Sequence, residues 1–375
     1  MYAASQWLFI LTTLKIFGTE KTGEITLCLA INAPVFLLFN MQLKNDYIKT
    51  NDQEKFHEYF YGRIITNVIS LTIVGIYTII TNDEIKIIIT TLIIAIIKCI
   101  EGVSEICQSR HQIDNEYTRI AKSTFIKSIG YIFTYPLISI VTGNIYTGLT
   151  ALIIHQAITY YIIDKIGVKS QIKNKQFTLK SFKTIAFRTY KLGFGSALDS
   201  LTTNGQRIII ANRIGLEALG TYAPLTQLIV IPQIFLTSIY QYQFPKIQKN
   251  KNSITIIYGS ALIVGIAIVL LSMIFENQIL KIMFDDYELA KDQLLIIISI
   301  CGLSWYLSGA INTIEIANGK YTSYTLSVCI SLITTILCTY IFIETQKLSG
   351  AGLALLIGYI TRIGASFLLR SSTIK

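Results

Sequence analysis

Charged side chains interrupt several long apolar stretches of this sequence, and their spacing marks candidate sites. Lys98, Glu101 and Glu105 follow one another at intervals of three and four residues, which places them on one face of a helix. A charge inside an apolar helix is costly unless it pairs with another charge or faces a cavity. The spacing is therefore consistent either with an internal Lys98–Glu101 pair or with a binding role.

A second group combines cations with amides. Asp199, Asn204 and Arg207 form a polar stripe in one apolar stretch, and Arg362 lies in another. A guanidinium group binds phosphate oxygens well, and amides can hydrogen-bond to sugar hydroxyl groups. These residue types suit a ligand that carries both phosphates and hydroxyl groups. The predicted substrate-cavity residues are Lys98, Glu101, Asp199, Asn204, Arg207 and Arg362.

Other ionisable residues in these stretches favour simpler interpretations. Lys15, Glu105 and Glu315 could extend to the nearest membrane interface. The histidines His57, His111 and His155 have no metal-ligand spacing. No phosphate-binding glycine loop of the Walker type is present in the sequence. The sequence therefore predicts neither an enzyme nor a metal site, and it requires no cofactor.

The composition indicates which elements position these residues. The chain has 375 residues, of which 52% are hydrophobic and only 14% are charged, against about 25% charged in soluble domains. Its apolar runs approach the length that crosses about 30 Å of hydrocarbon. The sequence predicts an all-α polytopic membrane protein with about twelve spans. These are residues 2–17, 25–41, 64–80, 85–107, 120–141, 145–163, 192–214, 222–240, 254–274, 294–316, 321–343 and 350–369. The first is short for a span, so we expect either a tilted helix or a chain that begins inside its first helix.

The basic residues predict an orientation. If both termini are cytoplasmic, the inner loops, the C-terminus and the cytoplasmic end of the span 120–141 hold 22 of the 32 Lys and Arg residues. Such a bias is typical of cytoplasmic loops, and it explains the net charge of +10 without nucleic acid as a partner. The basic stretch from Asp164 to Lys191 is predicted to be a solvated cytoplasmic linker near anionic lipid headgroups. It divides an N-terminal lobe, residues 1–170, from a C-terminal lobe, residues 171–375.

The two lobes share short patterns in the same order. Gly18-x-Glu20-x-x-Gly23 matches Gly215-x-Glu217-x-x-Gly220 at an offset of 197 residues, and Pro34 matches Pro232 at an offset of 198. Tyr117-Thr118 matches Tyr321-Thr322, and Gly148-Leu149 matches Gly352-Leu353, both at an offset of 204 residues. Each pair alone is weak, but four in order predict an internal repeat. Because each lobe has six spans, the repeats are parallel. This arrangement favours transport by alternating access.

Four stretches carry a resemblance to a known family: Gly18–Asn45 with "APVFLLFNMQLKN", Lys98–Ile120, Phe194–Ile247 with "QYQFPKI", and Ser308–Gly319. In their order and placement the sequence resembles the polysaccharide repeat-unit flippases (Wzx-type) of the multidrug/oligosaccharidyl-lipid/polysaccharide exporter superfamily. The resemblance implies a MATE-like fold of two six-helix lobes. It also implies that the chain flips an undecaprenyl-diphosphate-linked O-antigen or capsular oligosaccharide across a bacterial inner membrane. An H⁺ or Na⁺ gradient would drive the step, and the polysaccharide polymerase and chain-length machinery would be partners.

Two alternatives remain open. A multidrug or cation antiporter of the same superfamily would favour an acidic, aromatic cavity, and Lys98, Arg207 and Arg362 argue mildly against it. A membrane-embedded polymerase or ligase would need a long outer loop rich in Arg and His. The longest expected outer loop, Glu276–Asp292, is short and net acidic.

Overall fold

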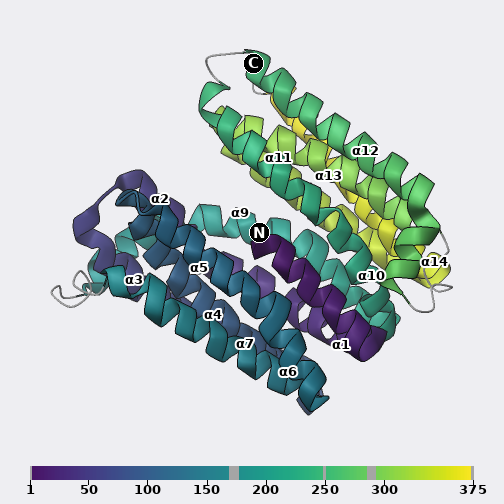
Figure 1. Ribbon diagram of the computed structural model, residues 1–375. Helices are drawn as coiled ribbons and strands as arrows, with labels where there is room; N and C mark the ends of the chain where they lie inside the picture. Colours follow the sequence, from purple (N-terminus) through teal and green to yellow (C-terminus); the bar gives the residue numbers. More distant parts are fainter. Residues whose placement is uncertain (1, 169–176, 248–250, 285–292, 373–375) are drawn as a thin grey trace. The chain divides into compact units, whose positions relative to one another are not determined.

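The computed structural model describes residues 2–168, 177–247, 251–284 and 293–372, and within these ranges every regular element is a helix (Figure 1). The first part of the chain contains α1 (Tyr2–Asn40), α2 (Leu43–Thr50), α3 (Phe56–Thr81), α4 (Ile85–Ile113), α5 (Tyr117–Ile129), α6 (Tyr135–Thr142) and α7 (Ile145–Thr159). The second part contains α9 (Leu179–Arg213), α10 (Leu216–Leu228), α11 (Val230–Gln243), α12 (Lys251–Met283), α13 (Leu294–Ala317) and α14 (Tyr321–Ser372). Single turns of wider or tighter helix connect or extend several of these: η1 (Gln53–Lys55), η2 (Gly130–Thr134), η3 (Tyr160–Asp164), η4 (Ile166–Val168) and η5 (Phe244–Lys246).

Eight helical segments of the described chain are long and apolar enough to cross a membrane. They are Ala4–Thr50, Gln53–Thr81, Ile85–Ile113, Tyr117–Thr142, Leu216–Lys246, Asn252–Met283, Leu294–Ala317 and Thr322–Leu369. The helix suits this environment because it satisfies its backbone hydrogen bonds within one segment. The helical membrane fold predicted from the sequence is confirmed, and the count of twelve spans stays a prediction.

Two of these segments are more than twice the length that one crossing requires. Ala4–Thr50 has 47 residues and Thr322–Leu369 has 48, whereas about 20 residues are enough. Each contains a backbone break. Gly18 has φ of 80° within α1, and Lys347 has φ of 50° within α14. Both breaks lie between two of the predicted spans.

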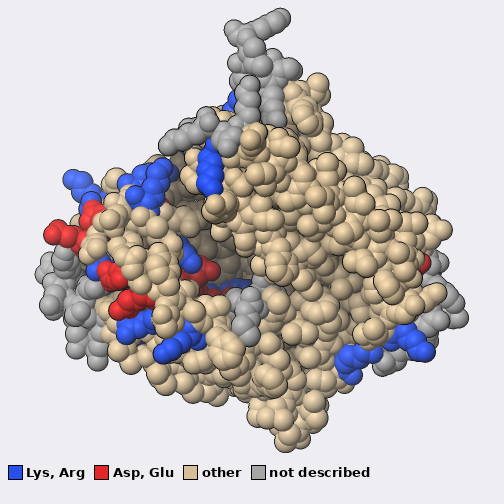
Figure 2. Space-filling model, turned by 45° about the horizontal axis from the view of Figure 1, so that its top comes forward, with Lys and Arg blue, Asp and Glu red and all other residues tan. Residues whose placement is uncertain are grey.

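The exterior is more apolar than that of a soluble protein, and the interior holds many polar side chains beside its apolar core. Ile80, Val141 and Ile263 expose more than 70% of their surface, while many Ser, Thr and charged side chains are buried. Figure 2 shows one face with a broad area that lacks Lys, Arg, Asp and Glu, and the charged side chains gather in a few clusters. An apolar exterior of this extent is suited to contact with lipid tails.

The contacts group the chain into two compact units. Unit 1 comprises residues 1–17 and 27–200, and unit 2 comprises residues 18–26 and 201–375. In unit 1, α4 packs against α3 and α7, and in unit 2, α13 packs against α12 and α14 (Figure 1). The predicted lobe boundary between residues 170 and 171 stays a prediction, because the two units are defined by contacts between residues and not by the sequence repeat.

Residues with a positive φ recur at the offsets of the sequence repeat. The pairs are Gly18 with Gly215, Asn115 with Gly319, and Gly143 with Lys347, all at positive φ. The first pair is 197 residues apart, and the other two are 204 apart. Gly18 and Gly215 belong to the sequence motif itself, whereas the other two pairs join a glycine to a different residue type. Because a positive φ is uncommon outside glycine, these two pairs add support to the predicted repeat.

The repeated glycine motifs also contact each other within unit 2. A Cβ atom added at Gly23 would lie 1.8 Å from the backbone oxygen of Leu216, and one added at Gly220 would lie 1.8 Å from that of Thr19. The contact is reciprocal. The segment of α1 after Gly18 and the start of α10 therefore approach each other closely, because neither carries a side chain at the crossing point. Small residues allow such close approach between membrane helices.

Candidate functional site

The predicted pair on α4 is formed in unit 1. Lys98 Nζ lies 2.8 Å from Glu101 Oε2, and the Tyr131 hydroxyl donates to Glu101 Oε1 at 2.7 Å. Glu105, one turn further along α4, is 3.4 Å from the guanidinium group of the buried Arg63. The charges on this helix face are therefore paired, and α3, α4 and the turn η2 hold them in place.

A more deeply buried pair lies next to this cluster. Lys127 Nζ is 2.8 Å from Asp164 Oδ2, and the Ser104 hydroxyl bonds both to that carboxylate, at 2.5 Å, and to the Lys127 ammonium group. Asp164 has no exposed surface, and its backbone oxygen is 2.9 Å from His111 Nε2. The sequence places Asp164 in a solvated linker, and this interpretation is wrong for that residue.

A cavity of about 210 Å³ joins these groups. It is lined by Lys44, Glu101, Ser104, Glu105, Gln108, Thr124 and Lys127. Both signs of charge and three neutral polar side chains meet here, which suits a polar ligand or an ion. Sequence reasoning identified Lys98 and Glu101 but missed Lys127. The signal that could have found Lys127 is its place within the same run of residues as the expected fifth span.

In unit 2, α9 presents the second predicted group. Arg207 donates from Nη2 to Thr226 Oγ1 at 3.1 Å and from Nη1 to Asn204 Oδ1 at 3.5 Å. Gln206, next in the stripe, donates to the backbone oxygen of Ala351 at 2.6 Å and accepts from the Tyr222 hydroxyl at 2.8 Å. The structure thus brings Asn204 and Arg207 together, while Gln206 ties α9 to α10 and α14.

The last two predicted residues are placed differently. Arg362 on α14 is only 1% exposed, and its guanidinium carbon lies 6.0 Å from the centroid of the Tyr324 ring. Asp199 is partly buried on α9 and is grouped with unit 1, whereas Asn204 and Arg207 are grouped with unit 2. Glu315, which could have extended to an interface, is instead buried and accepts from Ser323 at 3.0 Å.

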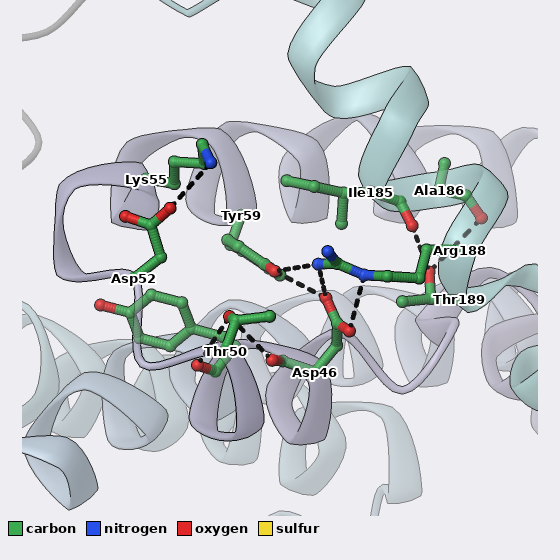
Figure 3. A network of polar contacts seen from close by, with 10 residues as sticks. Asp46, Thr50, Asp52, Lys55, Tyr59, Ile185, Ala186, Arg188 and Thr189 are labelled. Carbon is green, nitrogen blue, oxygen red and sulfur yellow. Dashed lines mark hydrogen bonds and ion pairs between the residues drawn. The ribbon is translucent and has the colours of Figure 1, made fainter.

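A polar cluster anchors the start of α9 to unit 1 (Figure 3). The Arg188 guanidinium group contacts both carboxylate oxygens of Asp46, at 3.0 and 2.5 Å, and the Tyr59 hydroxyl donates to Asp46 at 2.6 Å. The bond to Asp46 raises the pKa of Arg188. In the same cluster, the bond from Lys55 lowers the pKa of Asp52. Asp52, Lys55, Tyr59 and Arg188 line a cavity of about 280 Å³. The charges of the cluster neutralise one another, which favours an anchoring role.

Loss of this anchor is expected to destabilise the protein modestly. Asp46→Ala removes the acceptor of the Tyr59 hydroxyl and leaves Arg188 only its 2.9 Å bond to that hydroxyl. We expect a cost of about 1 kcal/mol because Arg188 is half-exposed and screened by water. Thermal unfolding of the purified protein in detergent measures it. Lys55→Ala, which removes only an exposed pair, is the control. Equal melting temperatures for Asp46→Ala and the parent protein would contradict the anchor.

In the described residues, no group of three or more His, Cys, Asp or Glu side chains is arranged to hold a metal ion. The polar clusters of the two units consist of ion pairs, amides and guanidinium groups.

Comparison with known proteins identifies the family. A family model described as "Polysaccharide biosynthesis protein" matches residues 16–246. The capsular polysaccharide biosynthesis protein CapF of Staphylococcus aureus is 28% identical over 373 residues, which cover 95% of this chain and 92% of CapF. These matches confirm the resemblance found in the sequence.

Solved structures show the same fold at low sequence identity. The lipid II flippase MurJ, in an inward closed conformation, matches with a TM-score of 0.76 and 14% identity, over 99% of this chain and 86% of MurJ. An inward-facing multidrug resistance transporter of the MATE family matches with a TM-score of 0.73 and 12% identity, over 99% of this chain and 94% of the transporter. Both are membrane transport proteins and not enzymes. Since the family model covers more than half of the sequence, the chain belongs to the polysaccharide biosynthesis protein family, and it has the fold of MurJ and the MATE transporters.

Proposed function

We propose that this chain flips an undecaprenyl-diphosphate-linked oligosaccharide from the cytoplasmic to the outer leaflet of a bacterial cytoplasmic membrane. The transported molecule would be a polysaccharide repeat unit, and the name of the relative CapF favours a capsular one over an O-antigen. Movement would occur by alternating access, with both termini in the cytoplasm. An H⁺ or Na⁺ gradient would drive it, and the polymerase and chain-length machinery would receive the product.

Arg362 is the observation that carries this proposal. It is almost fully buried in a helical segment long and apolar enough to cross the membrane, where a charge is costly and either pairs with another group or marks a functional site. A guanidinium group there offers planar, charged hydrogen bonds to a diphosphate. Arg207 on α9 supplies a second cation in the same unit, where it donates to Thr226.

The roles of these cations predict a graded loss of function. Arg362→Ala or Arg207→Ala is expected to lower surface polysaccharide about tenfold or more, because a charge-assisted hydrogen bond contributes about 1.5–3 kcal/mol. Arg→Lys at each position retains the charge and is expected to lose less. Surface polysaccharide is measured in a deletion strain complemented with each variant at equal membrane abundance.

Arg213→Ala is the matched control, because this arginine is half-exposed and forms a 3.5 Å pair with the exposed Glu344. Near-normal polysaccharide in all four site variants would remove Arg207 and Arg362 from the site.

The MATE fold also supports a second candidate, a multidrug or cation antiporter. Deletion of the gene separates the two. The flippase proposal predicts loss of surface polysaccharide and accumulation of the lipid-linked repeat unit in the cytoplasmic leaflet. Intact surface polysaccharide together with hypersensitivity to cationic drugs would instead establish the antiporter.

A further inference from the structure

Unit 2 contains a cavity of about 360 Å³ that none of the predicted site residues lines. Its walls come from α11, η5, α13 and the start of α14. They consist of Gln233, Thr237, Tyr240, Gln241, Phe244, Gly309, Asn312, Thr313, Ile316 and Tyr324. The volume lies in the range of small-ligand pockets.

The lining combines amides, hydroxyl groups and aromatic rings, and no Asp, Glu, Lys, Arg or His is among its ten residues. Amides both donate and accept hydrogen bonds, and threonine hydroxyl groups can do the same. Aromatic rings offer flat apolar faces with a polar handle at the tyrosine hydroxyl. A neutral, hydroxyl-rich molecule fits this chemistry, whereas a diphosphate finds no cation in these walls.

Two amides of the lining have unused hydrogen-bonding capacity. The side-chain oxygens of Gln233 and Asn312 are buried and accept no hydrogen bond from the described residues. Both residues lie in segments that are candidates to cross the membrane, where an unsatisfied amide is costly. Their terminal torsions are broad, so a small rotation would present these oxygens to a bound ligand.

The remaining walls are held in fixed positions. The Tyr240 hydroxyl donates to the backbone oxygen of Tyr306 at 3.1 Å, which holds the ring in place. A Cβ atom added at Gly309 would lie 3.3 Å from Gln233 Nε2 and 3.6 Å from Tyr240 Cε2. The glycine therefore keeps the space open beside the amide and the ring.

Tyr324 connects the cavity to the buried cation. It lines the cavity, and the Arg362 guanidinium carbon is 6.0 Å from its ring centroid. A neutral compartment and a cation thus share one aromatic residue. This arrangement, with a neutral cavity beside a cation, suits a ligand whose uncharged body is attached directly to an anionic group.

We propose that this cavity is a carbohydrate subsite that binds the sugar part of a lipid-linked oligosaccharide next to its diphosphate. The proposal rests on the flippase function proposed above and assigns its sugar recognition to α11 and α13. Gln233 and Asn312 hydrogen-bond to sugar hydroxyl or acetamido groups, and Tyr240 or Tyr324 packs against an apolar sugar face. Arg362 contacts the adjacent phosphate.

A binding experiment with two probes tests the subsite. The purified chain in lipid nanodiscs is titrated with the lipid-linked repeat unit extracted from the host and with undecaprenyl diphosphate that carries no sugar. The parent protein is expected to bind the sugar-bearing lipid about tenfold more tightly, equivalent to one or two hydrogen bonds. Gly309→Leu, which fills the cavity, and Asn312→Ala are expected to lose this preference and to keep the affinity for undecaprenyl diphosphate.

Gly259→Leu is the matched control, because a Cβ atom added there meets no atom within 4 Å, and it is expected to retain the preference. A tenfold preference that persists in both Gly309→Leu and Asn312→Ala overturns the subsite while the flippase function stands. Failure of the parent protein to bind either lipid overturns the flippase function as well.

Discussion

Replacement of Gly23 or Gly220 by alanine is expected to force α1 and α10 apart and to abolish most polysaccharide export. The added Cβ atom would lie 1.8 Å from a backbone oxygen in either case, and backbone cannot rotate away as a flexible side chain can. Overpacking at such a contact costs about 3 kcal/mol. This is enough to lower the population of molecules in which α1 and α10 are in contact about a hundredfold. Because the contact is reciprocal, the two substitutions are expected to have the same effect.

Cysteine labelling measures the opening. Thr221, next to Gly220, is only 2% exposed. Thr221→Cys is introduced into a variant whose six native cysteines have been replaced. Maleimide is expected to modify this cysteine slowly in the parent background and rapidly when Gly23→Ala is present. Gly259→Ala, at a glycine with open space around it, should change neither labelling nor export. Unchanged labelling in Gly23→Ala would show that the contact between α1 and α10 does not control the access of maleimide to residue 221.

Removal of one member of the Lys127–Asp164 pair is expected to be the most destabilising single change in unit 1. Lys127→Ala removes the ammonium group that lies 2.8 Å from Asp164 and leaves this fully buried carboxylate without a cation. Broken buried pairs of this kind cost about 3–5 kcal/mol. The double variant Lys127→Met with Asp164→Leu removes both charges and retains volume, so it should be less damaging than either single loss.

The melting temperature of the purified protein follows these changes. The exposed pair of Arg213 with Glu344, with a 3.5 Å separation, provides the comparison, because Arg213→Ala should cost less than about 1 kcal/mol. Similar melting temperatures for Lys127→Ala and Arg213→Ala would mean that the buried pair contributes nothing beyond a surface pair.

The membrane fold could be predicted from the sequence because lipid imposes one simple requirement on long apolar runs. The breaks at Gly18 and Lys347 fall where polar residues separate two predicted spans. The compact units could not be predicted, because hydropathy does not reveal which segments contact each other. Residues 18–26 illustrate this, since they group with unit 2 through the contact of Gly23 with Leu216 and Gly220.

The candidate sites were predictable where partners are close in sequence. Lys98 and Glu101, or Asn204 and Arg207, share one helix face, and the structure shows each pair in contact. Asp164 was misplaced because its partners, Ser104 and Lys127, are 60 and 37 residues away, and a carboxylate at the edge of a basic stretch is usually solvated. The neutral cavity gives even less sequence signal, because Gln233 and Asn312 meet only through the packing of α11 against α13.

The positive φ angles at matched positions bear on how the two predicted lobes arose. Where the first lobe has Gly143, the second has Lys347, and where the first has Asn115, the second has Gly319. A lysine at φ of 50° is strained, yet the positive φ recurs, while ψ differs between Gly143 (16°) and Lys347 (−125°). If an ancestral gene was duplicated, the positive φ at these positions has outlasted the residues that first made it easy. The sign of φ would then be a more durable record of common descent than residue identity in chains as diverged as these.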